Sequence, residues 1–316
     1  MAQPLKPPAL HPSDPVRIVS LASPVEKAAL EKGCAELERL GLVPRIDRQA
    51  VLARHSFFAG PADGRARAVK EALAEPDTGG IFCTRGGYGS NYLLSYLRGF
   101  EPAAKIVLGY SDITSVQVFL WQTLGWVTFY GPMVASGFDE SNGYDRDSFS
   151  LALGQNAGGW SIDLQGEALT SGSSEGILLG GCLTLVEATL GTPWELDTTG
   201  AILVLEDRGM RPYQVDRALM HLRQAGKFRK IRGLVLGEFP ECAAPDGGEN
   251  VRDVAMRVFT GARETASLPL VFGVPAGHTR RAMLTLPLGV QARLTAADAS
   301  GGKSGTRLDI LEPAVT

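Results

Sequence analysis

The chain has 316 residues, with 31 Lys and Arg against 34 Asp and Glu, which gives a formal net charge of −3. This balance argues against a nucleic-acid-binding protein, which carries a basic surface, and against a polybasic membrane anchor. A hydrophobic content of 44% is typical of a globular protein, and the length suggests about two domains at roughly 150 residues each. The 38 glycines, 12% of the chain (38/316), exceed the usual ~7% and predict many turns.

Cysteine usage and the N-terminal residues indicate the compartment. The four cysteines are far apart and form no CxxC motif, which is typical of free, buried thiols in a reducing environment: Cys34, Cys83, Cys182 and Cys242. Residues 1–15 are rich in proline and lack the apolar segment of a signal peptide, so we expect a flexible lead-in and a cytoplasmic protein. Residues 113–137 carry no charge, but Gln, Thr, Gly and Pro interrupt them, which favours a buried helix and strand over a membrane span.

The first half of the chain alternates between short apolar runs and segments with helical spacing. We predict strands at 16–22, 42–46, 80–84 and 105–110, and helices at 25–40, 62–74, 91–97 and 113–122. This alternation is typical of βαβ units and predicts an α/β domain whose parallel sheet is covered on both faces.

A polar passage rich in turn residues follows, with Asn142-Gly143 and Ser171-Gly-Ser-Ser174 as examples. We expect four parts: a lead-in (1–15), an N-terminal α/β domain (16–145), a linker (146–174) and a C-terminal α/β domain (175–316). The last part contains predicted strands at 201–205, 233–237, 268–272, 282–286 and 292–295, and helices at 212–225 and 250–260.

Ligands of parallel sheets bind beyond the carboxyl ends of the strands, so residues that follow the predicted strands are candidates for a site. Ser111 and Asp112 lie where a strand turns into a helix, which exposes a hydroxyl near the helix amides. The motif is not G-x-S-x-G, and a plain helix cap is the alternative, since Ser and Asp are both good caps.

A glycine-rich loop, Thr84-Arg-Gly-Gly-Tyr-Gly-Ser90, follows another predicted strand. Its glycines match neither the G-x-G-x-x-G fingerprint nor a P-loop, so phosphate binding is poorly supported. Adjacent glycines allow backbone N–H groups to approach a substrate closely, as an oxyanion hole requires; a simple tight turn is the alternative.

The strand at 201–205 runs into Glu206 and Asp207, two carboxylates that need partners if they are buried. Either they pair with nearby arginines, or one of them orients a histidine. None of the four histidines has metal-ligand spacing, and His278, in a loop shaped by glycine and proline, is the best placed to act as a base. Ser111, Glu206 and His278 can therefore be drawn as a Ser–carboxylate–His set that only folding could bring together.

Seven short stretches occur in an order that resembles the LD-carboxypeptidase family, peptidase S66, whose members include muramoyltetrapeptide carboxypeptidases and microcin C self-immunity proteins. They are Thr84-Arg-Gly-Gly-Tyr-Gly-Ser90, Gly109-Tyr-Ser-Asp-Ile-Thr114, Tyr130-Gly-Pro-Met133, Gly180-Gly-Cys-Leu-Thr184, Gly191-Thr-Pro193, Leu205-Glu-Asp207 and Gly273-Val-Pro-Ala-Gly-His278. The resemblance implies a flavodoxin-like N-terminal domain, a smaller swivelling β/α C-terminal domain, a homodimer, and no metal or organic cofactor.

The resemblance also implies a catalytic triad of Ser111, Glu206 and His278, with the serine as nucleophile and the histidine as base. Oxyanion donors would be the backbone N–H of Asp112 and one from Gly86 or Gly87. Recognition of a terminal carboxylate suits a guanidinium, and Arg85 and Arg280 are the candidates.

The implied substrate is a small peptide that ends in a D-amino acid: a murein tetrapeptide, from which D-alanine is released during peptidoglycan recycling. One alternative keeps the triad and changes the substrate to a microcin C-like peptidyl or aminoacyl nucleotide, with Trp160 or Trp194 as an aromatic shelf. The other is a non-catalytic protein that binds a small anion at the glycine loop.

Overall fold

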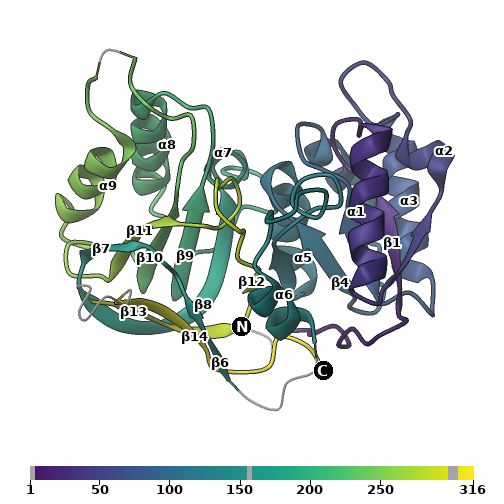
Figure 1. The fold of residues 1–316 in the computed structure, drawn as a ribbon. Coiled ribbons are helices and arrows are strands. Elements are labelled where there is room, and N and C mark those ends of the chain that lie inside the picture. Colours follow the sequence, from purple (N-terminus) through teal and green to yellow (C-terminus); the bar gives the residue numbers. More distant parts are fainter. Residues whose placement is uncertain (1–3, 155–158, 246, 298–304) are drawn as a thin grey trace. The chain divides into compact units, whose positions relative to one another are not determined.

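The computed structural model describes residues 4–154, 159–245, 247–297 and 305–316 (Figure 1). The chain divides into two compact units. Unit 1 comprises Met1–Asn156, Arg281–Pro287 and Ala314–Thr316, and unit 2 comprises Ala157–Arg280 and Leu288–Pro313. Two segments after residue 280 therefore return to the unit that contains the N-terminal half.

Unit 1 is built on a six-stranded sheet with the order β12-β5-β4-β3-β1-β2. The strands are β1 (Pro15–Val19), β2 (Val43–Ile46), β3 (Gly80–Cys83), β4 (Ile106–Gly109), β5 (Thr128–Tyr130) and β12 (Leu286–Leu288). Neighbouring strands from β2 to β5 pair in parallel. All residues of β3 and β4 are buried, as expected for central strands of a sheet that is covered on both faces.

Each helix predicted in the first half has a counterpart in unit 1, which also contains two helices that were not predicted, at 48–51 and 146–153. The helices of unit 1 are α1 (Lys27–Arg39), α2 (Arg48–Val51), α3 (Ala62–Ala74), η1 (Ser90–Leu93), α4 (Leu94–Leu97), η2 (Ser111–Ile113), α5 (Thr114–Leu124) and α6 (Arg146–Leu153). The uncharged stretch forms the largely buried α5 and the buried β5. Among the described residues, no helix is both long enough and apolar enough to span a bilayer.

Unit 2 contains an eight-stranded mixed sheet with the order β6-β14-β13-β8-β9-β10-β11-β7. Its strands are β6 (Trp160–Asp163), β7 (Glu167–Thr170), β8 (Gly172–Cys182), β9 (Ala201–Glu206), β10 (Gly233–Gly237), β11 (Leu270–Val274), β13 (Gln291–Ala296) and β14 (Thr306–Ile310). Strands β8 to β11 are parallel to one another, and the remaining pairings are antiparallel. Its helices are α7 (Leu183–Glu187), α8 (Pro212–Gln224) and α9 (Val251–Thr260).

The structure corrects the predicted linker and lead-in. The described part of 146–174 forms α6, β6, β7 and the start of β8. Buried and exposed residues alternate along β6, as expected for a strand with one solvent-facing side. The described part of the lead-in is held in place: the Leu5 amide donates to Gly125 O at 2.8 Å, and the Ala9 amide donates to Thr316 O at 3.0 Å. A strand was also expected at 282–286, whereas β12 begins at Leu286.

The four cysteines confirm the expectation of free, buried thiols. Burial raises the pKa of Cys83 and Cys182 above the ordinary range of a thiol. Because the thiolate is the reactive form of cysteine, these two thiols have low reactivity.

Candidate active site

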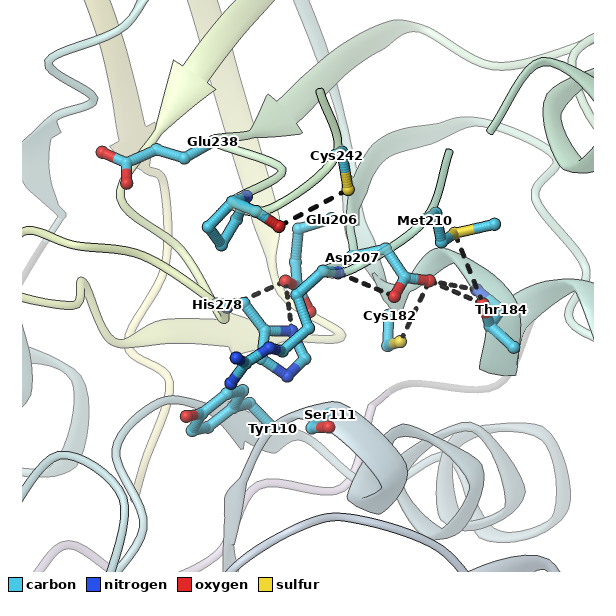
Figure 2. A network of polar contacts seen from close by, with 12 residues as sticks. Tyr110, Ser111, Cys182, Thr184, Glu206, Asp207, Met210, Glu238, Cys242 and His278 are labelled. Atoms are coloured by element: carbon cyan, nitrogen blue, oxygen red, sulfur yellow. Dashed lines mark hydrogen bonds and ion pairs between the residues drawn. The ribbon is translucent and has the colours of Figure 1, made fainter. Parts of the chain in front are cut away.

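Glu206 and His278 form a hydrogen-bonded pair in unit 2 (Figure 2). Glu206 ends β9 and is fully buried, and His278 lies in the loop that follows β11. Glu206 Oε2 accepts from His278 Nδ1 at 2.8 Å and from the His278 backbone N–H at 2.8 Å. With the Nδ1 proton directed at the carboxylate, Nε2 of the neutral ring is the basic nitrogen. The pair therefore has the arrangement of a base and the group that orients it.

Two glycines provide the space that the Glu206 side chain occupies. A Cβ added to Gly237, at the end of β10, would lie 2.5 Å from Glu206 Cβ. A Cβ added to Gly277, which has a φ of +65°, would lie 2.3 Å from Glu206 Cδ. Because they have no side chain, these two glycines allow the backbone to pass close to the buried Glu206 carboxylate.

Asp207, the neighbouring carboxylate, has a different role. Its Oδ2 accepts from the Thr184 amide at 2.9 Å and from Thr184 Oγ1 at 2.7 Å, and its Oδ1 accepts from the Arg208 amide at 2.8 Å. The Sγ of Cys182 contacts the same carboxylate at 3.5 Å (Figure 2). Asp207 thereby satisfies an N–H in the first turn of α7, a group that a helix leaves unpaired. Successive strand residues point to opposite faces, which explains why the two acids separate.

Ser111 is the first residue of η2 in unit 1, two residues after the end of β4, and its backbone is in the left-handed region with a φ of 62°. This conformation is unfavourable for a residue with a side chain, and such outliers cluster at functional sites. The Ser111 amide donates to the Tyr130 hydroxyl at 3.3 Å. The cap positions of η2 and α5 are Tyr110 and Ile113, neither with a side-chain cap bond, so Ser111 is not the plain helix cap considered above.

The glycine loop lies directly beside Ser111. A Cβ added to Gly86 would lie 2.8 Å from both Cβ and Oγ of Ser111, and 3.3 Å from the Asp112 amide nitrogen. A Cβ added to Gly87, with a φ of +111°, would meet Ser23 Oγ at 2.3 Å. The structure therefore brings Gly86, the neighbour of Gly87, close to Ser111 and to the Asp112 amide, with no side chain between them.

Three side chains that were not predicted hold this loop in place. Ser23 Oγ accepts from the Tyr88 amide at 3.1 Å, Arg65 Nη1 donates to Gly89 O at 2.9 Å, and Asp112 Oδ2 accepts from the Ser90 amide at 2.8 Å. Arg65 also donates to the carbonyls of Gly60 and Leu21 although only 4% of its surface is exposed. A charged residue among the apolar positions of α3 was the one sequence signal of such an anchor.

Asp112 therefore has two features of interest: a backbone amide near Gly86 and a buried carboxylate that holds the glycine loop. It is 1% exposed, and burial raises its pKa while hydrogen bonds from Ser90 act in the opposite direction. Ser90 Oγ in turn donates to the Asp112 carbonyl. Two hydrogen bonds, both donated by Ser90, therefore fasten the glycine loop to the turn that carries Ser111.

The two predicted guanidinium groups are both exposed. Arg85 lies in the glycine loop of unit 1. In unit 2, Arg280 lines a cavity of about 450 Å³ together with Glu238, Phe239 and Glu241, and its backbone N–H donates to Glu238 Oε2 at 2.9 Å. Trp160 is buried in β6 at 9% exposure, which does not fit the shelf considered above. Within the described ranges no group of three or more His, Cys, Asp and Glu residues is placed to hold a metal ion.

Comparison with protein families gives two matches in chain order. The LD-carboxypeptidase N-terminal domain matches residues 16–131, and the LD-carboxypeptidase C-terminal domain matches residues 175–294. The first match includes Ser111 and the glycine loop, and the second includes Glu206 and His278.

Individual carboxypeptidases are also similar to this chain. A probable murein peptide carboxypeptidase of Bacillus subtilis is 30% identical over 93% of this chain and 92% of its own length. A murein tetrapeptide carboxypeptidase of Pseudomonas aeruginosa is 29% identical over 83% of this chain and 87% of its own. The crystal structure of a muramoyltetrapeptide carboxypeptidase from Oxalobacter formigenes has a TM-score of 0.76 at 29% identity and covers 94% of this chain and 99% of that one.

The fold is also that of the microcin C7 self-immunity protein MccF, whose wild-type apo structure has a TM-score of 0.86 at 23% identity and covers 99% of this chain and 100% of that one. The chain belongs to the LD-carboxypeptidase family, peptidase S66, a family of serine hydrolases.

Proposed function

We propose that this protein is a serine carboxypeptidase that cleaves the L,D-peptide bond before the terminal D-alanine of murein tetrapeptide, with Ser111, His278 and Glu206 as its triad. The observation that carries the proposal is the Glu206–His278 pair, in which a fully buried carboxylate fixes both the backbone and the ring of the histidine. The murein peptides named for its relatives support the substrate.

In the proposed reaction, Ser111 Oγ attacks the scissile carbonyl while His278 Nε2 takes the hydroxyl proton. The tetrahedral intermediate collapses to an acyl-enzyme, the proton passes from Nε2 to the leaving amine, and D-alanine departs. Water then attacks the ester with the same base, which releases the tripeptide and restores the serine. Glu206 keeps the proton on Nδ1 and stabilises the imidazolium that forms in each half-reaction.

The oxyanion of this reaction would be bound by backbone amides in unit 1. The Asp112 amide and the Gly86–Gly87 segment both lie at the Ser111 side chain, and Gly86 approaches most closely. The loop is fixed by Ser23, Arg65 and Asp112, so its donors would need little rearrangement as charge develops.

A carboxypeptidase also has to recognise the free carboxylate of its substrate. We propose Arg85 and Arg280 for this role, because a guanidinium binds a carboxylate through two parallel hydrogen bonds. Arg85→Met and Arg280→Met should each raise KM more than they lower kcat. We further propose that the enzyme acts as a homodimer, as the family resemblance implies, and that it works in the cytoplasm, as its free cysteines favour.

The deciding experiment incubates the protein with murein tetrapeptide and detects tripeptide and D-alanine by mass spectrometry, with Ser111→Ala as the matched variant. We expect release by the wild type and a loss of about 10⁴-fold or more in the variant. An aminoacyl sulfamoyl-adenosine is tested in parallel. Cleavage of that compound without cleavage of the tetrapeptide contradicts the proposed substrate, and full activity of Ser111→Ala contradicts the mechanism.

A further inference from the structure

A cavity of about 580 Å³ in unit 1 is lined by residues of β1, α2 and α3, three elements that contact one another (Figure 1). Its lining residues fall within the segments 17–20, 47–53 and 59–71. The volume is in the range of small-molecule binding sites, about 300–1,000 Å³. Ser111, Glu206 and His278 do not line this cavity, so the proposed reaction does not account for it. We call it the α3 cavity.

The α3 cavity contains hydrogen-bond donors that the described residues leave without acceptors. Arg65 is 4% exposed, and its Nε and Nη1 donate to three backbone carbonyls, but its Nη2 makes no hydrogen bond within the described part of the chain. Arg17 Nε is buried and likewise has no hydrogen-bond acceptor there, although Glu75 Oε2 lies at ion-pair distance, 3.4 Å. Because a buried donor without an acceptor is unfavourable, these groups favour a ligand that supplies one.

The charges around the α3 cavity favour a negatively charged ligand. No carboxylate of the described residues lies within ion-pair distance of Arg65; burial lowers the pKa of its guanidinium, and Asp112 raises it from farther away. Arg67, which is exposed, adds another guanidinium to the lining. Of the acids that line the cavity, Asp47 already accepts from two amides at the start of α2, and Glu71 is exposed. Since buried charges in proteins are normally paired, the missing partner is an anion.

The first turn of α3 and an apolar wall complete the lining. Gly60, Pro61 and Gly64 line the cavity, and Pro61, the N-cap of α3, offers no side-chain acceptor to the first-turn amides. Such amides lack intrahelical partners, and the start of a helix attracts negative charge. Ile18 and Val51 are buried apolar residues of the same lining. A ligand that suits both surfaces has an anionic group and an apolar body.

Two side chains of the α3 cavity also hold the glycine loop beside Ser111. Arg65 donates to the Gly89 carbonyl at 2.9 Å. Ser20 Oγ lies 2.9 Å from Oγ1 of Thr84, the first residue of the loop, and both side chains are buried. A ligand bound to Arg65 Nη2 would leave these hydrogen bonds in place and restrict the motion of the side chains that make them. Occupation of the cavity should therefore reduce the mobility of the loop.

We propose that the α3 cavity is an effector site for a small organic anion, a carboxylate or a phosphate with an apolar body, and that its occupation stabilises the glycine loop. The anionic group would bind Arg65 Nη2, Arg17 and the start of α3, and the apolar body would contact Ile18 and Val51. This inference goes beyond the proposed function and does not depend on which substrate is cleaved at Ser111.

Binding is tested by calorimetry with phenyl phosphate and benzoate, two probes that share a ring and differ in the anionic group, and with the neutral benzyl alcohol. We expect at least one of the anions to bind about tenfold or more tightly than the alcohol, and the tighter one identifies the preferred group. Equal affinity for all three probes, or no binding of either anion, would overturn the proposal.

Variants of α3 locate the bound anion. Arg67→Gln removes a lining guanidinium, and Gly64→Leu adds a side chain at a position where nothing lies within 4 Å of the Cβ. Each variant, shown to be folded by a thermal melt, should weaken binding of the tighter anion about tenfold. Lys70→Gln is the matched control, because Lys70 is a cation of α3 that does not line the cavity. Binding that is weakened by Arg85→Met and not by Arg67→Gln would place the anion at the glycine loop and contradict the cavity site.

Hydrogen exchange tests the link to the glycine loop. The amides of Tyr88 and Ser90, which donate to Ser23 Oγ and Asp112 Oδ2, should exchange about tenfold more slowly when the wild type is saturated with the tighter anion. The same anion should leave exchange in Gly64→Leu unchanged. Tight binding in the cavity with no change in exchange at these two amides would show that the site does not act on the loop.

Discussion

Glu206 binds His278 at two points, the backbone amide and Nδ1, each at 2.8 Å from the same carboxylate oxygen. The contact to the backbone amide fixes the position of the loop that contains His278, and the contact to Nδ1 fixes the orientation of the imidazole ring. The carboxylate is fully buried, while 11% of the His278 side chain is exposed, so the ring reaches the surface of unit 2 and its partner does not.

Glu206→Gln should lower kcat by about 10²- to 10⁴-fold and change KM little, because an amide does not hold the proton on Nδ1 or stabilise the imidazolium. Steady-state kinetics on murein tetrapeptide, with a thermal melt to establish folding, provide the measurement. A folded variant with wild-type kcat would show that Glu206 has no part in the reaction.

Asp207→Asn is the matched control, since it changes the adjacent carboxylate. This variant weakens the contacts at the start of α7, so we expect a loss of about 1 kcal/mol in the free energy of unfolding. Its kcat should stay within a few-fold of wild type, in contrast to Glu206→Gln. Urea denaturation beside the kinetic assay distinguishes the two roles.

Gly86→Ala should inactivate the enzyme and also lower its stability, because the added methyl group would lie 2.8 Å from both Cβ and Oγ of Ser111 and would force the turn that carries the serine to shift. Gly64→Ala is the control: nothing lies within 4 Å of its Cβ position, and it lies inside α3. That change should stabilise the fold by about 0.5–1 kcal/mol and leave activity intact. Labelling of Ser111 by an active-serine reagent compares the two variants directly, and equal labelling would contradict the assignment of Gly86.

Asp112→Ala should lower kcat about 10- to 100-fold, because it removes the acceptor that holds the Ser90 amide and so loosens the glycine loop. Asp112→Asn retains an acceptor oxygen and should recover most of the activity. The ratio of kcat between the two variants is the informative quantity. Equal activity would mean that the loop keeps its position without this contact.

Stability at acid pH should depend on Glu36. Hydrogen bonds from Arg39, and with them one from the Tyr144 hydroxyl at 2.6 Å, lower the pKa of Glu36 from 4.5 to about 2. A lowered pKa in the folded state means that the stabilisation is complete above pH 4.5 and is lost as the pH falls toward 2. We expect Glu36→Gln to remove about 1–2 kcal/mol at pH 7 and much less at pH 2. Urea melts at several pH values test this, and an equal loss at every pH would refute it.

The alternation of strands and helices in the first half was readable from the sequence because each element has a clear apolar period. Helix α3, for example, covers the residues predicted for it, 62–74. The region assigned as a linker was misread for a physical reason. The first part of β8 has exposed residues at alternate positions, and Gly and Ser there are typical of turns as well as of strand edges.

The residues of the candidate site were also only partly predictable from the sequence. Residue position placed Ser111, Glu206 and His278 at strand ends, and the family resemblance implied their roles. Only the structure shows that the Asp207 carboxylate accepts a hydrogen bond from Thr184. Ser23 and Arg65 were missed because each acts on backbone groups far away in the chain, and no local pattern encodes such a contact.

The left-handed backbone at Ser111 bears on how this fold tolerates change. A glycine at that position would adopt the same φ without the steric penalty of a Cβ, which is about 1–2 kcal/mol, and this relief exceeds the roughly 0.5–1 kcal/mol that the extra freedom of glycine in the unfolded chain costs. Ser111→Gly should therefore melt at a higher temperature than wild type. A rise in melting temperature would show that the serine is kept here at a cost in stability, as expected for the nucleophile proposed above.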